Sequence, residues 1–370
     1  MINHCFSIII AGGKGTRFWP LSRAHRPKQL LKILSRKSLV DETVGRVIAL
    51  GGRARTLVVT VAEQVGAMRK ELRALPRTNF VTEPQGKNTA PCIGLAALEI
   101  LRRDPHGVMI VLPADHWVAK HKQFQRRLKA AVKLAMQQNR LITIGIRPNY
   151  PETGYGYIVK SKAVGRPSAG AFQVGKFTEK PNLAVAKQLM RQGALWNSGI
   201  FVWKAATLLE LLNRYQPQIA DGLKAIRAAA AGKSLCNPSP RLRAVIEREY
   251  KKMPNLSIDY ALLEKAGAEG KVLTLTADFG WSDVGSWAAV HRMMHKDIHG
   301  NAGNGRWLQL GAKNCLIHSA DRLIVLLGIE NAVVVDTPDA LLVGDLSRSQ
   351  EVRELVDELN RRGLGAYTIK

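Results

Sequence analysis

The sequence predicts an α/β protein with a Rossmann-like, mixed and mostly parallel sheet flanked by helices, followed by a small C-terminal β unit and a final helix. In the first half, short β-branched apolar runs alternate with longer amphipathic segments, which is typical of strands joined by crossover helices. After residue 300 the pattern changes to short strands at nearly regular spacing. The 370 residues are 46% hydrophobic, enough for a large core. We therefore predict two domains, residues 1–295 and 296–370.

The expected elements follow from local patterns. In the first half, strands are expected at 7–11, 57–61, 108–112 and 141–146, and helices at 88–103 and 123–138. Asn88 or Thr89 caps the first of these helices, and Pro91 stands in its first turn. The middle section, 149–283, adds strands at 172–177 and 199–203 and helices at 182–192 and 258–266, which suggests insertions that extend the same sheet. The C-terminal strands are expected at 314–318, 323–327, 332–336 and 340–344, and the final helix at 349–362.

Composition narrows the classes of partner. The formal net charge is +26, but Lys and Arg are spread along the whole chain and form no single basic arm, which argues against a nucleic-acid-binding protein. No run of about 18 apolar residues and no basic leader is visible, so we expect a soluble, cytoplasmic protein that does not bind a membrane. The four cysteines, Cys5, Cys92, Cys236 and Cys315, are far apart, and we expect them to be reduced and buried.

A glycine-rich turn follows the first expected strand. Its glycines allow backbone amides to approach phosphate oxygens closely, so phosphate binding is the direct inference. The turn is not a P-loop, because no Gly-Lys-Ser/Thr follows at the required spacing, and Phe18 stands where a dinucleotide fingerprint has its third glycine. The alternative is a tight turn without a ligand. The residues of the turn are Ala11-Gly12-Gly13-Lys14-Gly15-Thr16-Arg17.

The segment after this turn extends the pattern. With Trp19-Pro20-Leu21-Ser22-Arg23 and Pro27-Lys28-Gln29, the run resembles the signature of sugar-phosphate nucleotidyltransferases, specifically mannose-1-phosphate guanylyltransferases. The resemblance implies the nucleotidyltransferase fold and a glycine loop that covers a nucleoside triphosphate. By position, Arg17 and Lys28 contact the phosphates. Lys14, Arg23 and Arg26 could assist, with a solvated surface as the alternative for each. The loop residues assigned to the nucleotide are Ala11, Gly12, Gly13, Gly15 and Thr16.

Residues 82–91 also resemble the guanylyltransferase pattern and lie between an expected strand and a helix. Guanine presents N1–H and N2–H₂ as donors, so a carboxylate or an amide oxygen is a suitable partner. Glu83 and Asn88 are the candidates, with Gly86 beside them. The alternative is that Asn88 only caps the helix and that Glu83 pairs with a neighbouring basic residue.

Two aspartates are candidates for a metal site. Asp115 follows a buried apolar strand, at the edge where open α/β sheets bind ligands. Asp283 lies far downstream, in the run 280–287. The resemblance implies that Asp115 and Asp283 together hold Mg²⁺, which needs few protein oxygens because it also takes phosphate oxygens and water. For a lone aspartate at a strand end, the alternative is a helix cap.

Three further runs, 153–158, 177–181 and 196–201, resemble sugar-site motifs of the same family. The resemblance implies that Lys180 pairs with the sugar phosphate and that Gly154, Glu179 and Asn197 face sugar hydroxyls. The chemistry agrees, because a phosphate dianion favours Lys and vicinal hydroxyls favour Glu and Asn. Without the resemblance, residues 179–181 would be an ordinary charged turn.

The resemblance therefore implies transfer of GMP from GTP to mannose 1-phosphate, by direct in-line attack with Mg²⁺, giving GDP-mannose and pyrophosphate. Alternatives are another sugar 1-phosphate such as glucose 1-phosphate, another nucleoside triphosphate, or a non-catalytic basic relative that binds ligands or nucleic acid. A cupin-type isomerase domain, which many bacterial relatives carry, is not expected, and a homodimer is left open. The expected catalytic residues are Arg17, Lys28, Asp115, Lys180 and Asp283.

Overall fold

The computed structural model describes residues 4–13, 15–165 and 170–369. The chain divides into two compact units, and each is discontinuous in sequence. The first unit comprises residues 1–12, 43–114 and 118–281, and the second comprises 13–42, 115–117 and 282–370. The glycine-rich turn is thus one of the places where the chain passes from one unit to the other. The domain boundary predicted between residues 295 and 296 stays a prediction.

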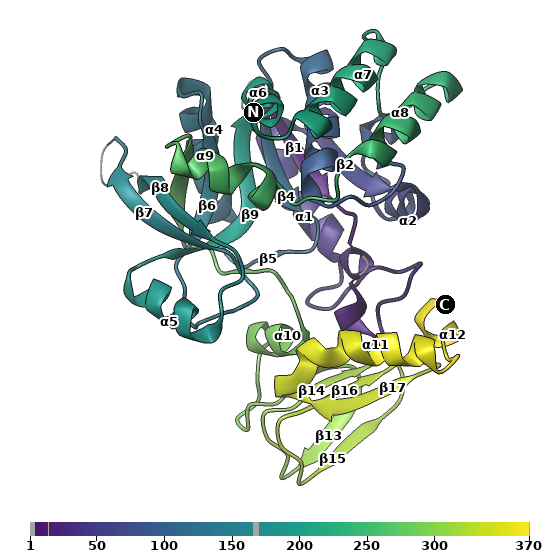
Figure 1. Cartoon of the computed structure of the whole chain (residues 1–370). Coiled ribbons are helices and arrows are strands. Elements are labelled where there is room, and N and C mark those ends of the chain that lie inside the picture. The colour runs from purple at the N-terminus through teal and green to yellow at the C-terminus, as the bar shows by residue number, and fades with distance from the viewer. Residues whose placement is uncertain (1–3, 14, 166–169, 370) are drawn as a thin grey trace. The chain divides into compact units, whose positions relative to one another are not determined.

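The first unit contains a mixed sheet with the strand order β3-β2-β1-β4-β9-β6-β10-β8-β7 (Figure 1). The strands β3, β2, β1 and β4 are parallel neighbours, as are β6 and β10, whereas β9 runs antiparallel between β4 and β6. The carboxyl ends of β1, β3 and β4 therefore meet at one edge of the sheet. The strands are β1 (Cys5–Ile10), β2 (Thr56–Val61), β3 (Phe80–Glu83), β4 (Val108–Pro113), β6 (Leu141–Ile146), β7 (Tyr157–Ala163), β8 (Ala171–Thr178), β9 (Leu195–Lys204) and β10 (Val272–Ala277).

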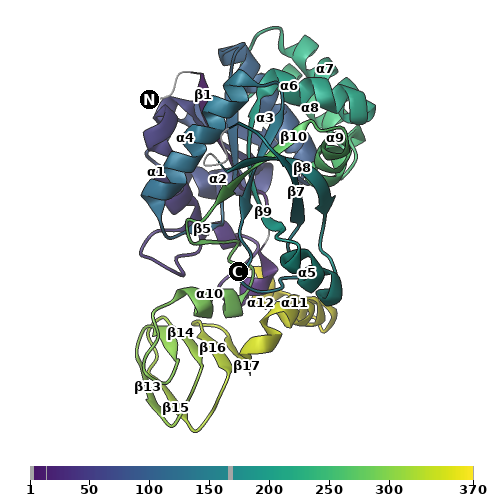
Figure 2. The same ribbon diagram turned by 90° about the vertical axis from the view of Figure 1, so that its left-hand side faces the viewer.

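Helices cover both faces of this sheet, which explains why its parallel strands are almost continuously apolar. On one face, α1 and α4 lie side by side (Figure 2), and Gln125 of α4 donates a hydrogen bond to the main-chain oxygen of Arg46 in α1 at 2.9 Å. A π-helical turn, Asp259–Leu263, precedes α9, where the sequence predicts an ordinary helix. The helices are α1 (Leu39–Gly51), α2 (Ala62–Glu71), α3 (Thr89–Arg103), α4 (His121–Gln137), α5 (Leu183–Arg191), α6 (Ala205–Tyr215), α7 (Pro217–Ala230), α8 (Pro240–Lys252) and α9 (Glu264–Ala268).

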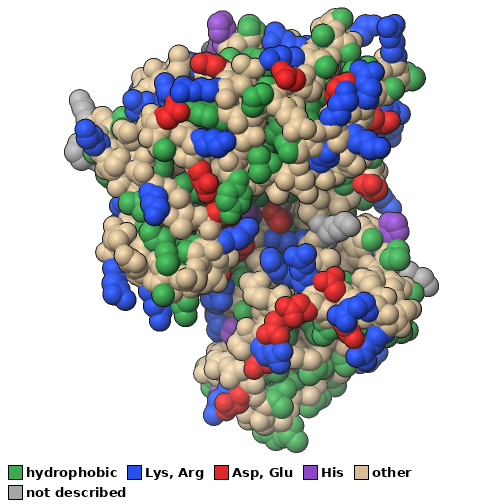
Figure 3. All heavy atoms as spheres, viewed as in Figure 1, with side chains coloured by type: hydrophobic (Ala, Val, Ile, Leu, Met, Phe, Trp, Pro, Cys, Tyr) green, Lys and Arg blue, Asp and Glu red, His purple; other side chains and the backbone are tan. Residues whose placement is uncertain are grey.

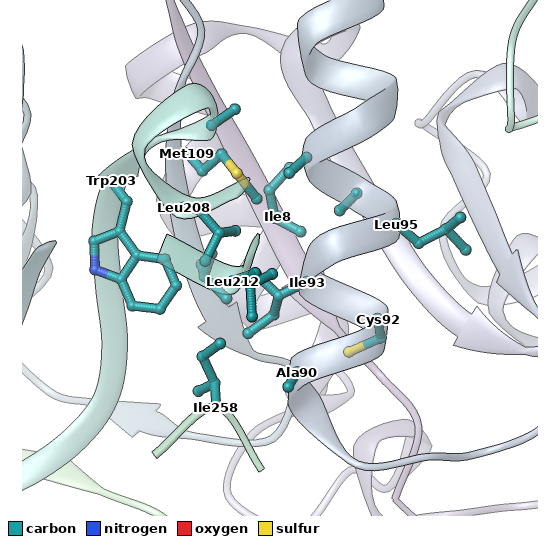
Figure 4. Packing of buried hydrophobic residues seen from close by; sticks show 14 of the residues in the cluster. Ile8, Ala90, Cys92, Ile93, Leu95, Met109, Trp203, Leu208, Leu212 and Ile258 are labelled. Carbon is teal, nitrogen blue, oxygen red and sulfur yellow. The ribbon is translucent and has the colours of Figure 1, made fainter. Parts of the chain in front are cut away.

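The main core lies on the other face, between the sheet and α3, α6, α7 and α8. Ile8 of β1 and Met109 of β4 point toward Ile93 of α3, and Leu208 and Leu212 of α6 complete the contact (Figure 4). All five side chains are at most 1% exposed. This packing holds α3 against the sheet, and so its N-terminus stays beside the ends of β1 and β3.

The second unit contains the small β unit that the sequence predicts. The strands β12, β14 and β16 are parallel neighbours in one sheet, β17 is antiparallel to β16, and β13 pairs in parallel with β15. Helix α11 runs across the larger sheet (Figure 1), and its Val352 and Val356 are buried against Val333 and Leu342. The elements are β12 (Ala302–Asn304), β13 (Trp307–Leu310), β14 (Leu316–Ser319), β15 (Ile324–Leu327), β16 (Ala332–Asp336), β17 (Leu341–Asp345), α10 (Trp287–Met293), α11 (Val352–Arg361) and α12 (Ala366–Ile369).

The scattered basic side chains and the buried cysteines match the expectations from the composition. Lys and Arg side chains are scattered over the face seen in Figure 3 and do not gather in one patch there. None of the helices formed by the described residues is long and apolar enough to cross a membrane. Cys5, Cys92, Cys236 and Cys315 are buried and form no disulfide.

Candidate active site

The glycine-rich turn packs tightly against Lys28. Gly15 has φ 68°, in the left-handed region that glycine adopts without strain. A Cβ atom at Gly15 would lie 2.3 Å from Cβ and 2.8 Å from the backbone nitrogen of Lys28, so a side chain here would displace the lysine. Thr16 and Arg17 follow in a short 3-10 turn, and Gln29 Nε2 donates to the main-chain oxygen of Gly13 at 3.2 Å. Lys14 lies outside the described residues.

Lys28 links the two predicted metal ligands within the second unit. Its Nζ lies 2.7 Å from Oδ2 of Asp115 and donates to the main-chain oxygen of Asp283 at 2.6 Å. The lysine is only 8% exposed. Burial raises the pKa of Asp115, but the charges of Lys28 and His116 lower it more, so that this pKa lies below its usual value. Asp115 is therefore ionised at neutral pH.

The chain around Asp283 leaves room for its carboxylate. A Cβ at Gly285 would lie 2.8 Å from Oδ2 of Asp283, and Val284 adopts φ 50°, which a β-branched residue rarely does. In the described part of the chain, no cluster of three or more His, Cys, Asp or Glu side chains is arranged to hold a metal. Asp115 and Asp283 nevertheless fit a cation such as Mg²⁺, which completes its shell with phosphate oxygens and water.

These residues line a cavity of about 810 Å³ that belongs entirely to the second unit. Arg17, Lys28, Asp115 and Asp283 lie on its wall. Other residues that line the cavity come from the C-terminal helices α11 and α12, which the sequence did not connect with the site. Their amphipathic pattern identifies a polar face but not what that face approaches. These additional lining residues are Arg353, Val356, Asp357 and Asn360 of α11 and Thr368 and Ile369 of α12.

Helix α12 also contacts the segment that follows the turn. Trp19 Nε1 donates to the main-chain oxygen of Tyr367 at 2.9 Å. The backbone nitrogen of Ala24 donates to the main-chain oxygen of Thr368 at 3.2 Å. Arg23, a candidate for a phosphate contact, is buried and forms an ion pair with Asp339 at 3.1 Å. Arg26 is exposed. Arg23 thus has a partner within the protein and also lines the cavity, and its phosphate role stays a prediction.

In the first unit, Glu83 is the last residue of β3, which β2 separates from β1. Its Oε1 would be 3.6 Å from a Cβ at Gly12, and its Oε2 accepts a hydrogen bond from the hydroxyl of Tyr250 in α8. Burial raises the pKa of Glu83 to about 7, although the Tyr250 hydrogen bond opposes this. Thr60 Oγ1 donates to the main-chain oxygen of Ala11 at 2.8 Å. Tyr250 was not identified from the sequence, because nothing local marks it.

Asn88 and Gly86 lie just beyond β3. The Oδ1 of Asn88 accepts a hydrogen bond from the backbone nitrogen of Thr89 at 3.0 Å, so Asn88 caps α3, and its role toward the base stays a prediction. Its φ of 62° is unusual for a residue other than glycine. A Cβ at Gly86 would meet only Val61, at 3.8 Å, which leaves open space around that glycine.

The predicted sugar residues all belong to the first unit, and Glu179, Lys180 and Asn197 lie close together there. Glu179 Oε1 lies 3.3 Å from Nζ of Lys180. A Cβ at Gly156 would lie 2.5 Å from Oε2 of Glu179 and 3.5 Å from Cβ of Asn197, so this glycine leaves space for both side chains. Lys180 adopts φ 45°, a conformation that costs energy and is common at functional sites. Gly154 is exposed, and its nitrogen donates to Oε1 of Glu152 at 2.9 Å.

The Nucleotidyl transferase family model matches residues 6–300, which cover this sheet and both groups of site residues. The chain belongs to the nucleotidyl transferase family. A second model, the MannoseP isomerase/GMP-like beta-helix domain, matches residues 305–359 in the small β unit. The chain is therefore a nucleotidyltransferase, and the predicted fold class is confirmed.

Relatives cover almost all of the chain. The xanthan biosynthesis protein XanB of Xanthomonas campestris pv. campestris (strain B100) is 38% identical over 363 residues, which are 98% of this chain and 74% of that protein. The mannose-1-phosphate guanylyltransferase of Klebsiella pneumoniae is 36% identical over 97% of this chain and 75% of its own length. These matches confirm the resemblance to mannose-1-phosphate guanylyltransferases.

A solved structure has the same fold over nearly the whole chain. The crystal structure of mannose-1-phosphate geranyltransferase from Thermus thermophilus superposes with a TM-score of 0.86 and 31% identity, covering 96% of this chain and 99% of that one. The small β unit and the terminal helices thus belong to the shared architecture.

Proposed function

We propose that this nucleotidyltransferase transfers GMP from GTP to mannose 1-phosphate and releases pyrophosphate. The observation that carries the proposal is the contact of Lys28 with both Asp115 and the backbone of Asp283, beside the glycine-rich turn. The contact brings a cation, the carboxylate of Asp115 and the backbone of Asp283 together, and a cation with carboxylates nearby suits a nucleoside triphosphate and a divalent metal. The name of the Klebsiella pneumoniae relative, mannose-1-phosphate guanylyltransferase at 36% identity, supports the choice of GTP and mannose 1-phosphate.

The proposed reaction needs positioning and charge screening more than proton transfer. The attacking oxygen of a sugar 1-phosphate is already anionic, so no general base is required. Two like unit charges about 4 Å apart repel by roughly 4 kcal/mol at an effective dielectric near 20. Arg17 and Lys28 offset this repulsion on the triphosphate, while the amides of Gly12, Gly13 and Gly15 surround its oxygens.

Asp115 and Asp283 are the proposed ligands of Mg²⁺. When bound, the ion neutralises charge on the phosphate oxygens and orients the triphosphate. Lys28 keeps Asp115 ionised, because the pair favours the charged form of the carboxyl. The Lys28 ammonium also donates a hydrogen bond to the main-chain oxygen of Asp283. One ammonium therefore contacts both residues that we propose as ligands.

The remaining roles concern recognition. We assign the guanine to Glu83, whose carboxylate accepts from N1–H and N2–H₂ when ionised, with Gly86 and Asn88 at the same edge. We assign the sugar phosphate to Lys180, whose side chain pairs with Glu179, is 65% exposed and extends from a strained backbone. Glu179, Asn197 and Gly154 are assigned to the sugar hydroxyls.

The test is pyrophosphate release by purified protein given Mg²⁺, GTP and mannose 1-phosphate, with ATP, UTP and glucose 1-phosphate in parallel. Release with GTP and mannose 1-phosphate alone is the expected result, and a chelator should abolish it until excess Mg²⁺ is added. Release with a different pair would overturn the substrate assignment but keep the reaction type. No release from folded protein with any pair would refute the proposed function.

A further inference from the structure

Asp259 is a carboxylate in the sugar group that none of the predicted roles uses. It begins the π-helical turn before α9 and is partly buried. Its Oδ1 accepts a hydrogen bond from Nδ2 of Asn197 at 2.9 Å. Single π-helical turns are rare and frequently occur at functional sites, which makes the position worth explaining.

The Asn197 amide is held at both ends. Its Oδ1 accepts from Oγ1 of Thr143 at 3.0 Å and from the backbone nitrogen of Gly199 at 3.3 Å. The Gly199 nitrogen can only donate, and the Asp259 carboxylate, when ionised, can only accept. The amide oxygen must therefore face Gly199 and the amide nitrogen must face Asp259. Chemistry alone selects this orientation, and one N–H of Nδ2 remains for a ligand.

The backbone before Asp259 is anchored as well. The Ile258 nitrogen donates to Oγ1 of Thr89 at 2.8 Å, and the Ala90 nitrogen donates to the main-chain oxygen of Leu256 at 3.1 Å. Both contacts join the segment to the first turn of α3. The carboxylate of Asp259 is thus fixed by the core helix rather than by a loose surface loop.

Charged neighbours surround this carboxylate. Burial and the negative charge of Glu179 raise the pKa of Asp259 to about 7, while its own backbone, Asn197 and Lys180 lower it. Two carboxylates and one amide kept close together are costly to bury without a ligand that donates hydrogen bonds. Sugar hydroxyls are such donors.

We propose that Asp259 is a positioning residue of the sugar subsite, which acts by orienting the Asn197 amide so that its remaining N–H donates to a hydroxyl of the sugar 1-phosphate. The inference rests on the proposed function, because it assumes that Asn197 meets the sugar. Thr143 supports the same orientation from the opposite end of the amide.

The experiment is a double-mutant cycle on pyrophosphate release with Asp259→Ala, Asn197→Ala and the double variant. Each single change should raise KM for mannose 1-phosphate roughly tenfold, the effect of losing about one well-placed hydrogen bond, and leave KM for GTP within about twofold. The double variant should be no worse than Asn197→Ala, because both changes remove the same contact. Asp259→Asn, whose amide oxygen can still accept from Asn197, should recover most of the loss.

Glu264→Gln is the matched control, since this carboxyl also has its pKa raised by burial and by Glu179 but forms no hydrogen bond with Asn197. Its kinetic constants should not change.

Independent, additive effects in the cycle, or an unchanged KM for mannose 1-phosphate in Asp259→Ala, would overturn the inference while leaving the proposed function intact. If Asp259→Ala does not fold, Thr143→Val tests the same orientation, and an unchanged KM there would count equally against it. A wild-type protein without turnover refutes the proposed function instead.

Discussion

The ammonium group of Lys28 lies 2.7 Å from the carboxylate of Asp115, and the pair is largely shielded from water on the lysine side. The same ammonium donates to the backbone of Asp283. In this arrangement a single buried cation sets both the ionisation of one proposed metal ligand and the position of the other. Removing either partner leaves an uncompensated charge, which is costly in a buried position.

Replacing Asp115 with Asn should therefore lower kcat by about 100- to 1,000-fold, because the amide keeps the shape but supplies no charge for the metal. Pyrophosphate release measures the loss, and circular dichroism checks the fold. Asp278→Asn is the control, since that carboxylate is 82% exposed, and it should stay within about twofold of the wild type. A folded Asp115→Asn variant with normal kcat would contradict the metal assignment.

Gly15→Ala should destabilise the second unit and lower activity. The new Cβ would overlap Lys28, and the left-handed backbone costs a non-glycine residue about 1–2 kcal/mol. Thermal unfolding and pyrophosphate release measure the two effects. Gly66→Ala provides the contrast, because that glycine lies within α2 with open space around its Cβ, and alanine should stabilise the helix by about 0.5–1 kcal/mol. Equal stability of the two variants would refute the argument.

Glu83 should make stability depend on pH. Its folded pKa of about 7 lies above the ordinary value of 4.5, so its contribution is fully present below pH 4.5 and is lost as pH rises through 7. The full change corresponds to about 3 kcal/mol at most. Denaturant unfolding at pH 5 and pH 8 should show a smaller drop in Glu83→Gln than in the wild type. Parallel drops in both proteins would mean that Glu83 titrates normally.

Lys180→Met should raise KM for mannose 1-phosphate by about tenfold or more and leave KM for GTP nearly unchanged, because the proposed partner of Lys180 is the sugar phosphate. Initial rates with each substrate varied in turn separate the two constants. Lys176→Met, on the neighbouring strand β8, is a suitable control for general loss of charge. An effect on GTP alone would move Lys180 to the nucleotide.

Much of the fold could be predicted because its signals are local. The strand predicted at 141–146 is β6, the strand predicted at 332–336 is β16, and the helix predicted from Asn88 begins at Thr89 with Asn88 as its cap. The helix predicted at 258–266 instead begins with a π-helical turn. Hydrophobic spacing over nine residues does not distinguish the two, because contacts of the Asp259 segment with α3 and Asn197 decide the local geometry.

The sequence by itself determined the class of fold, the glycine-rich turn after the first strand and the chemistry of the candidate residues, since these depend on neighbouring positions and on residue type. Only the tertiary structure decided which distant residues meet. Residues 13–42 and 115–117 belong to one compact unit with residues 282–370, Lys28 reaches the backbone of Asp283 across 255 positions, and Tyr250 reaches Glu83 across 167. Such contacts arise when strands and helices pack around a common core, and the free energy that selects them is spread over many buried side chains instead of being encoded in any local pattern.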